Sequence, residues 1–73
     1  MKRERIEEQR SGVTLAQAKA DVEARGYTVS HAACWEDENH VYAFSVEDYG
    51  PGTFGHPRCT AHYSKRSGWY TVD

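Results

Sequence analysis

The sequence predicts an α+β domain in which one helix packs on an antiparallel meander of three to four strands. Two observations carry this prediction. An alanine-rich segment with helical spacing of its apolar residues occupies positions 14–26, and beyond Tyr27 the apolar period changes to two. Short polar turns then separate the alternating segments, as is typical of consecutive hairpins.

The helix is expected over the stretch TLAQAKADVEARG. Thr14 and Gln17 have the spacing of a capping box at its start, and Gly26 stands where a helix commonly stops. One face repeats apolar residues at i, i+3 and i+7, which is the pattern of a buried helix face. Because alanine is small, this face is expected to lie close to a sheet. Its residues are Leu15, Ala18 and Val22.

The first hairpin is expected from YTVSHAACWE, residues 27–36, and HVYAFSVE, residues 40–47, which alternate on either side of the polar turn DEN. An unbroken alternation from Val29 through Ala33 places Trp35 on the core side of the first strand.

The second hairpin is expected later in the chain. The segment 48–57 contains three glycines and two prolines, which exclude regular structure. RCTAHYS and WYTVD then flank the turn KRSG, in which Gly68 supplies the unusual backbone angles.

The chain of 73 residues has room for one small core, so we expect a single α+β domain over residues 11–73. Residues 1–10 are almost entirely charged and carry no apolar stripe. They are interpreted as a charged lead that is disordered, or that forms an extra helical turn or an edge strand when it docks.

Charge and hydropathy narrow the class of protein. The formal net charge is −2, with acidic residues gathered in 36–48 and basic residues in 58–66. This balance argues against a general nucleic-acid binder, which usually carries a basic excess. No segment has the apolar length of a membrane span or of a signal peptide, so the expected location is the cytoplasm. Cysteines in that compartment are expected as free thiols or metal ligands rather than as a disulfide.

The spacing His-x-x-Cys occurs twice and raises the question of a metal site. Four such ligands are typical of structural zinc. Residues three apart on a regular strand point to opposite faces, however, so an unbroken strand prevents the first pair from meeting at one ion. We therefore expect neither a metal nor a cofactor. A zinc-stabilised module and a cross-strand disulfide between the cysteines remain as alternatives. The candidate ligands are His31, Cys34, His56 and Cys59.

An enzyme is not expected. The chain has little volume for a substrate pocket, and no local motif supports a thiol–imidazole pair. The stretch GPGTFG has the glycines of a phosphate loop but lacks the Lys-Ser/Thr ending and the helix that should follow.

The aromatic residues indicate a binding surface. Eight of the nine Trp, Tyr and Phe residues lie beyond Tyr27, which is more than one thin helix can cover on a small sheet. Several are therefore expected on the open face of the sheet or in the 49–57 loop, where aromatic residues near arginine are typical of binding hot spots. The alternative is a second small core formed with the N-terminal lead. The predicted partner-binding residues are Tyr49, Phe54, Arg58, Tyr63, Lys65, Arg66 and Trp69.

Two resemblances refine this prediction. The stretch TLAQAKADVEARGYTV resembles the helix-to-strand opening of PepSY-type domains, which are small modules that bind or inhibit partner proteins. The helix TLAQAK, followed by an aromatic antiparallel sheet that ends in KRSGWYTVD, is similar to small phage-encoded anti-CRISPR proteins. The second resemblance implies a stoichiometric inhibitor that occupies a surface of a CRISPR effector complex.

The sequence thus leads us to expect a small non-enzymatic protein-binding module, a phage or mobile-element inhibitor that docks on a larger protein or nucleoprotein complex. Neither a membrane nor free nucleic acid is the expected partner. The alternatives are the zinc-stabilised module and a nucleic-acid accessory protein.

Overall fold

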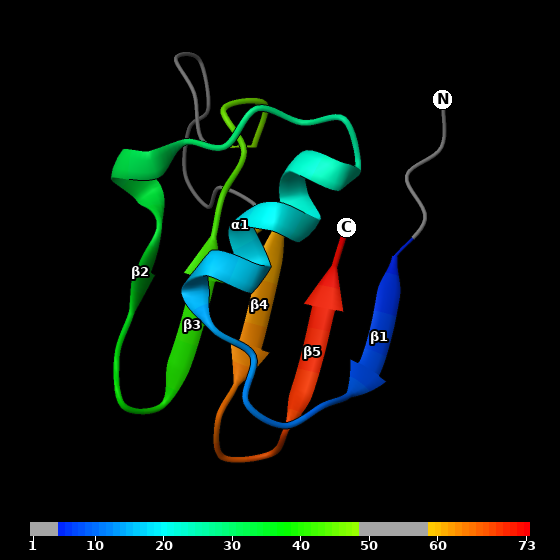
Figure 1. Ribbon diagram of the computed structural model, residues 1–73, viewed down its shortest axis with the longest axis vertical. Coiled ribbons are helices and arrows are strands. Elements are labelled where there is room, and N and C mark those ends of the chain that lie inside the picture. The colour runs from blue at the N-terminus through cyan, green and yellow to red at the C-terminus, as the bar shows by residue number, and fades with distance from the viewer. Residues whose placement is uncertain (1–4, 49–58) are drawn as a thin grey trace.

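The computed structural model describes residues 5–48 and 59–73, and these residues form a helix packed on a five-stranded sheet (Figure 1). The strand order is β1-β5-β4-β3-β2, and every neighbouring pair is antiparallel. The α+β class is therefore confirmed, with β2 to β5 as the meander. The elements in chain order are β1 (Ile6–Gln9), α1 (Leu15–Ala24), a 3₁₀ turn η1 (His31–Ala33), β2 (Trp35–Glu36), β3 (His40–Ala43), β4 (Ala61–Ser64) and β5 (Trp69–Val72).

The N-terminal lead supplies the fifth strand, so the expected count of three or four strands is wrong. β1 pairs with β5 from Ile6 opposite Val72 to Gln9 opposite Trp69. The Arg10 N–H then donates to the Gly68 carbonyl at 2.8 Å, which extends the pairing toward the β4–β5 turn. A strand this rich in charge is tolerated because it lies at the edge of the sheet, where charged side chains discourage pairing with other chains.

The helix forms as the sequence predicts. Thr14 caps it, since its Oγ1 accepts the Gln17 N–H at 3.1 Å. The Gln17 side chain does not complete a capping box but donates to Asp21 Oδ1 at 3.0 Å. Gly26 follows the last turn with φ +87°, a left-handed conformation that glycine adopts without steric cost. Within the described residues α1 is the only α-helix, and it is neither long nor apolar enough to cross a membrane.

The expected long strand over 27–36 is interrupted, which corrects the register around Trp35. Val29 makes only an isolated bridge to Ser45, and η1 follows, with the Ala33 N–H donating to the Ser30 carbonyl at 2.9 Å. Alanine has low strand propensity, so two consecutive alanines let this local turn replace extended backbone. The turn changes the alternation, and Trp35 lies on the face away from the helix with 46% of its surface exposed.

The core lies between α1 and the sheet. Alternate strand residues point toward the helix, and the helix lies chiefly over β3 and β4 (Figure 1). Ala43 and Ala61 are directly opposite each other and fully buried, which allows the helix to approach closely. The buried side chains of this core are Val13, Ala18, Val22, Val29, Val41, Ala43, Ala61, Tyr63, Tyr70 and Val72.

Candidate functional site

The sheet face away from α1 carries a continuous group of aromatic and imidazole rings. Trp35 lies opposite Tyr42, which in turn lies opposite His62 on β4. The ring centroids of Trp35 and Tyr42 are 4.5 Å apart, and those of Tyr42 and His62 are 4.9 Å apart. His40 stacks at 5.3 Å from His62, and Phe44 lies 5.9 Å from Trp35. We call these five residues the ring cluster.

Strand alternation places the ring cluster on this face. In β3, Val41 and Ala43 point into the core, so His40 and Tyr42 between them point outward. In β4 the same alternation sends Ala61 inward and His62 outward. Residues directly opposite each other on antiparallel strands share a face, so the outward rings come into contact across the strands.

No helix or strand of residues 5–48 and 59–73 covers this face of the sheet. Trp35 is 46% exposed, and Trp69 on β5 is 49% exposed. Trp69 lies opposite Gln9 at the β1 side of the same face. Within the ring cluster Trp35 is exposed, His40, Tyr42 and His62 are partly exposed, and Phe44 is buried. Two half-exposed tryptophans on one sheet face, beside partly exposed rings, indicate an interaction site.

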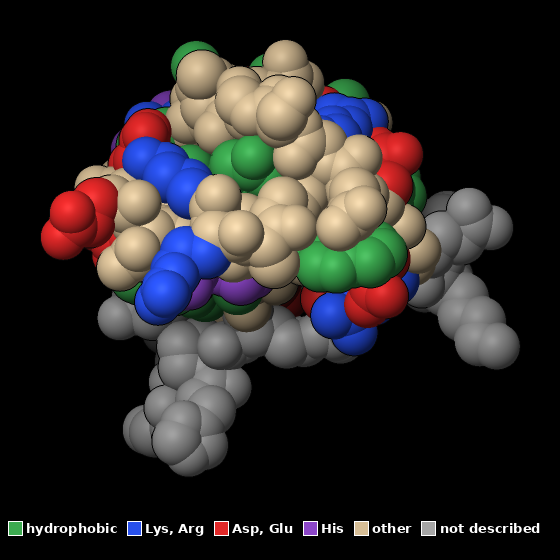
Figure 2. Space-filling model, turned by 90° about the horizontal axis from the view of Figure 1, so that it is seen from below, with side chains coloured by type: hydrophobic (Ala, Val, Ile, Leu, Met, Phe, Trp, Pro, Cys, Tyr) green, Lys and Arg blue, Asp and Glu red, His purple; other side chains and the backbone are tan. Residues whose placement is uncertain are grey.

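One imidazole of the ring cluster, that of His62, has a lowered pKa. Burial lowers the pKa of His62, because desolvation penalises the charged imidazolium, and the nearby His40 lowers it further. Figure 2 looks at the end of the molecule that carries the β2–β3 and β4–β5 turns, where Lys/Arg and Asp/Glu side chains are interspersed. The arrangement of an aromatic centre with charged groups around its edge is typical of protein interfaces.

Two of the predicted contact residues lie in the β4–β5 turn. Lys65 joins this turn to the β2–β3 turn, because its Nζ donates to Glu36 Oε2 at 2.7 Å and to the Asp37 carbonyl at 2.6 Å. The Lys65 ammonium also lowers the pKa of Glu36. Arg66 is exposed at the tip. The Lys65 ammonium therefore makes contacts within the chain that hold the two turns together.

Tyr63, a third predicted contact residue, faces the helix and is only 5% exposed. Its hydroxyl accepts the Gly12 N–H at 3.2 Å and donates to the Arg10 carbonyl at 3.1 Å. These contacts fix the connection between β1 and α1, so the structure places Tyr63 in the core and away from the open face. The predicted residues Tyr49, Phe54 and Arg58 lie outside the described residues.

The two cysteines are free thiols in this structure. The Cys34 thiol donates to the Ser30 carbonyl at 3.3 Å, and the Cys59 thiol donates to the Ala61 carbonyl at 2.9 Å. Desolvation raises the pKa of Cys59 to about 11, which keeps it protonated at neutral pH. No three His, Cys, Asp or Glu residues within the described parts of the chain are grouped to hold a metal. His56, one of the four candidate zinc ligands, lies outside those parts.

A buried polar network links the residues that flank segment 49–58. Thr60 Oγ1 accepts the Ser45 N–H at 2.9 Å and donates to the Asp48 carboxylate. The Asp48 N–H donates to Ser45 Oγ at 3.2 Å. All three side chains are buried. The network holds the chain before and after this segment in fixed relative positions, and the sequence analysis did not identify it.

A groove of about 250 Å³ lies on the helix side, between α1 and the β5–β1 half of the sheet. Its polar groups contact one another: the Tyr70 hydroxyl donates to Asp21 Oδ2 at 2.6 Å, and the Arg10 guanidinium stacks 5.2 Å from the Tyr70 ring. Arg10 also forms an ion pair with Glu8. These contacts brace β1 against the helix, and so we assign this groove a structural role.

None of the five ring-cluster residues is among the predicted contact residues. The outward positions of His40 and Tyr42 follow from the alternation of HVYA once Val41 is assigned to the core. Trp35 could not be found this way, since the 3₁₀ turn that precedes it gives no strong sequence signal.

Comparison with protein-family models, with curated proteins and with solved structures finds no match to this chain. The candidate site therefore rests on its geometry and chemistry.

Proposed function

We propose that this protein is a small non-enzymatic module that binds a larger protein or nucleoprotein complex through the open face of its sheet. The observation that carries the proposal is the ring cluster, which is contiguous and which no helix or strand of the described residues covers. Trp35 and Trp69 expose about half of their surfaces on this face.

The composition of the face supports a protein partner. Trp and Tyr are over-represented among the residues that contribute most to binding, because they bury a large area with few rotatable bonds. The ring contacts already hold Trp35, Tyr42 and His62 against one another, so little side-chain freedom is lost on binding. The open face is therefore preorganised for an interface.

A non-enzymatic role is supported by the state of the nucleophile candidates. The Cys59 thiol has a raised pKa and donates to a backbone carbonyl. Thiol chemistry requires the thiolate, which such an environment disfavours. The proposal accordingly assigns a stoichiometric binding role to the protein.

Nucleic-acid binding is the second candidate, because single-stranded bases stack on aromatic residues of an exposed sheet. The open face presents the rings for such stacking, but the outward residues of β3 and β4 are His40, Tyr42, His62 and Ser64, none of which is Lys or Arg. Phosphate neutralisation by cations supplies much of the affinity in that class. The geometry therefore favours the protein partner.

The most specific form of the proposal is an inhibitor that occupies a surface of a CRISPR effector complex, as the anti-CRISPR resemblance of the sequence implies. A binding module without catalytic groups is suited to inhibition by occupancy. This form of the proposal predicts that expression of the protein protects a targeted plasmid in a host with an active CRISPR system.

The experiment that tests the general proposal is affinity capture from a host lysate with matched variants. The tagged wild-type protein is compared with Trp35→Ala, which truncates the ring cluster, and with Glu23→Ala, which alters an exposed residue of α1. A specific partner should be retained by wild type and by Glu23→Ala and lost with Trp35→Ala. Tight, strongly salt-dependent binding of the purified protein to a free oligonucleotide would instead support the nucleic-acid candidate.

A further inference from the structure

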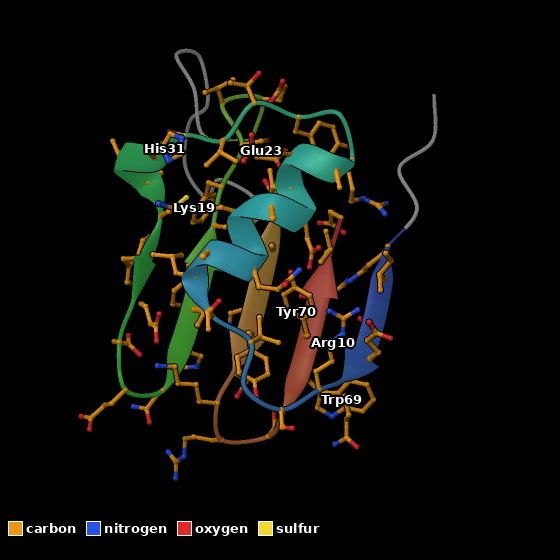
Figure 3. The ribbon with its side chains drawn as sticks, viewed as in Figure 1. Arg10, Lys19, Glu23, His31, Trp69 and Tyr70 are labelled. Carbon is orange, nitrogen blue, oxygen red and sulfur yellow. The ribbon has the colours of Figure 1, made fainter. Side chains whose placement is uncertain are left out.

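A shallow groove of about 280 Å³ opens on the outer face at the β1–β5 edge of the sheet, and Glu7, Trp69 and Thr71 line it. Glu7 lies directly opposite Thr71, and Trp69 is the next outward residue of β5. Figure 3 shows Trp69 at the start of β5 beside β1. A carboxylate and a half-exposed indole thus share one groove.

This pair of groups has the chemistry of a cation site. The face of an indole ring attracts a cation through its quadrupole, and tryptophan is the strongest of the aromatic residues in this respect. A carboxylate beside it adds charge attraction and hydrogen-bond acceptors. A guanidinium uses both groups together, because it is planar enough to stack on the ring and presents several N–H donors to the carboxylate.

Glu7 already has a cationic neighbour, but the contact is easily exchanged. Arg5 Nε lies 3.1 Å from Glu7 Oε1, and both side chains are more than half exposed, at 60% and 53%. Such exposed ion pairs contribute little stability. Arg5 Nε also lies 3.9 Å from Asp73 Oδ1, so the Arg5 guanidinium is shared between two carboxylates. An incoming cation can therefore replace Arg5 at Glu7 at small cost.

We propose that this groove receives an arginine side chain of the protein partner, with the guanidinium stacked on Trp69 and ion-paired with Glu7. The inference rests on the proposed function, since it places one specific contact within the open face. The inference also requires that the partner surface that faces this edge of the sheet is basic. A phosphate group is disfavoured there because Glu7 would repel it.

The test follows the two indole N–H signals by NMR while N-acetyl-arginine-N-methylamide is added to the folded protein. The neutral isostere N-acetyl-citrulline-N-methylamide is the control ligand. Trp35 is the internal control, because it is as exposed as Trp69 but has Tyr42 and Phe44 as ring neighbours. We expect the Trp69 signal to shift with the arginine compound, with a smaller effect on Trp35 and on addition of citrulline.

Two variants complete the test. Glu7→Gln should weaken the response of Trp69 by about two- to fivefold, which is the size expected for one exposed charge contact beside an aromatic ring. Glu8→Gln removes the same charge from the same strand, but its carboxylate pairs with Arg10, so the response of Trp69 should persist. Equal responses of both indoles, an equal response to citrulline or no effect of Glu7→Gln would overturn the proposal.

The captured partner separates this inference from the proposed function. If Trp35→Ala abolishes capture and Glu7→Gln leaves the affinity unchanged, the open face binds the partner but the arginine site is wrong. If the partner is still captured by Trp35→Ala and by Trp69→Ala, the proposed function itself fails, whatever the titration with the arginine compound shows.

Discussion

Tyr63 and Trp69 were both predicted contact residues, and they differ in burial in a way that truncation can measure. Tyr63 is 5% exposed and Trp69 is 49% exposed. A buried aromatic side chain removes about 200 Å² from water, so at about 25 cal/mol per Å² the upper limit for Tyr63 is about 5 kcal/mol. We therefore expect Tyr63→Ala to lower the free energy of unfolding by about 3–5 kcal/mol. Half that area gives an upper limit of about 2.5 kcal/mol, so we expect Trp69→Ala to cost about 1–2 kcal/mol.

The difference is large relative to the total stability. A domain of this length is expected to have about 4–11 kcal/mol in all, so Tyr63→Ala removes a large part of it. Urea unfolding followed by circular dichroism measures both variants. With a slope of about 1 kcal/mol per molar urea, the midpoint of Tyr63→Ala should fall by about 3 M or more.

Tyr63→Phe is the matched control for this comparison, because it removes only the hydroxyl that contacts Gly12 and Arg10. It should cost about 1 kcal/mol, the usual net value of a hydrogen bond. Equal midpoints for Tyr63→Ala and Trp69→Ala, or a larger loss for Trp69→Ala, would refute the assignment of Tyr63 to the core.

Three further predictions concern single side chains. Burial lowers the pKa of His62 below its usual value of 6.5, so the unfolded chain binds the proton more readily than the folded chain. The free energy of unfolding should therefore fall as the pH drops below about 6.5. His62→Gln should flatten this dependence in urea titrations between about pH 7 and 5. Tyr70→Phe removes the donor to Asp21 Oδ2 and should lower stability by about 1–2 kcal/mol without affecting partner capture; an unchanged urea midpoint would contradict the bracing role. Thr60→Val removes a hydroxyl partner of the buried Asp48 and should cost about 1–3 kcal/mol, measured in the same way, whereas a neutral result would show that the polar network contributes no stability.

The helix and the second hairpin could be predicted because local chemistry determines them. Thr14 caps the helix through its own side chain, and Gly26 and Gly68 adopt the positive φ angles that their positions require. The alternation of β4 also follows from sequence, since Ala61 points inward and His62 outward. Each of these features depends on residues close together in the sequence, so it can be predicted without the tertiary structure.

The remaining features depend on contacts between distant residues. β1 is charged and has no apolar stripe, and its strand conformation comes from pairing with β5, whose residues lie 60 to 66 positions later in the chain. The position of Trp35 depends on the 3₁₀ turn that precedes it, which replaces extended backbone. The sequence also cannot show which aromatic residues the helix covers, and Tyr63 was therefore assigned to the surface in error.

The ring cluster could be predicted only in outline. The number of aromatic residues indicated that some must lie on the open face, and Trp69 was placed there as the structure has it. Trp35, Tyr42 and His62 come into contact because their three strands pair in one particular register. Predicting the contact therefore requires knowing that register. Predicting a single strand does not show which residues of the neighbouring strand lie opposite it.

The most direct test of the account is an NMR footprint of the isotope-labelled protein in complex with the captured partner. The account predicts that the indole signals of Trp35 and Trp69 and the amides of Tyr42 and His62 change most on binding, because these residues lie on the open face. The exposed residues of α1, such as Glu23, should change little. A footprint centred on α1, with unchanged Trp35 and Trp69 signals, would contradict the claim that the open face of the sheet is the binding surface.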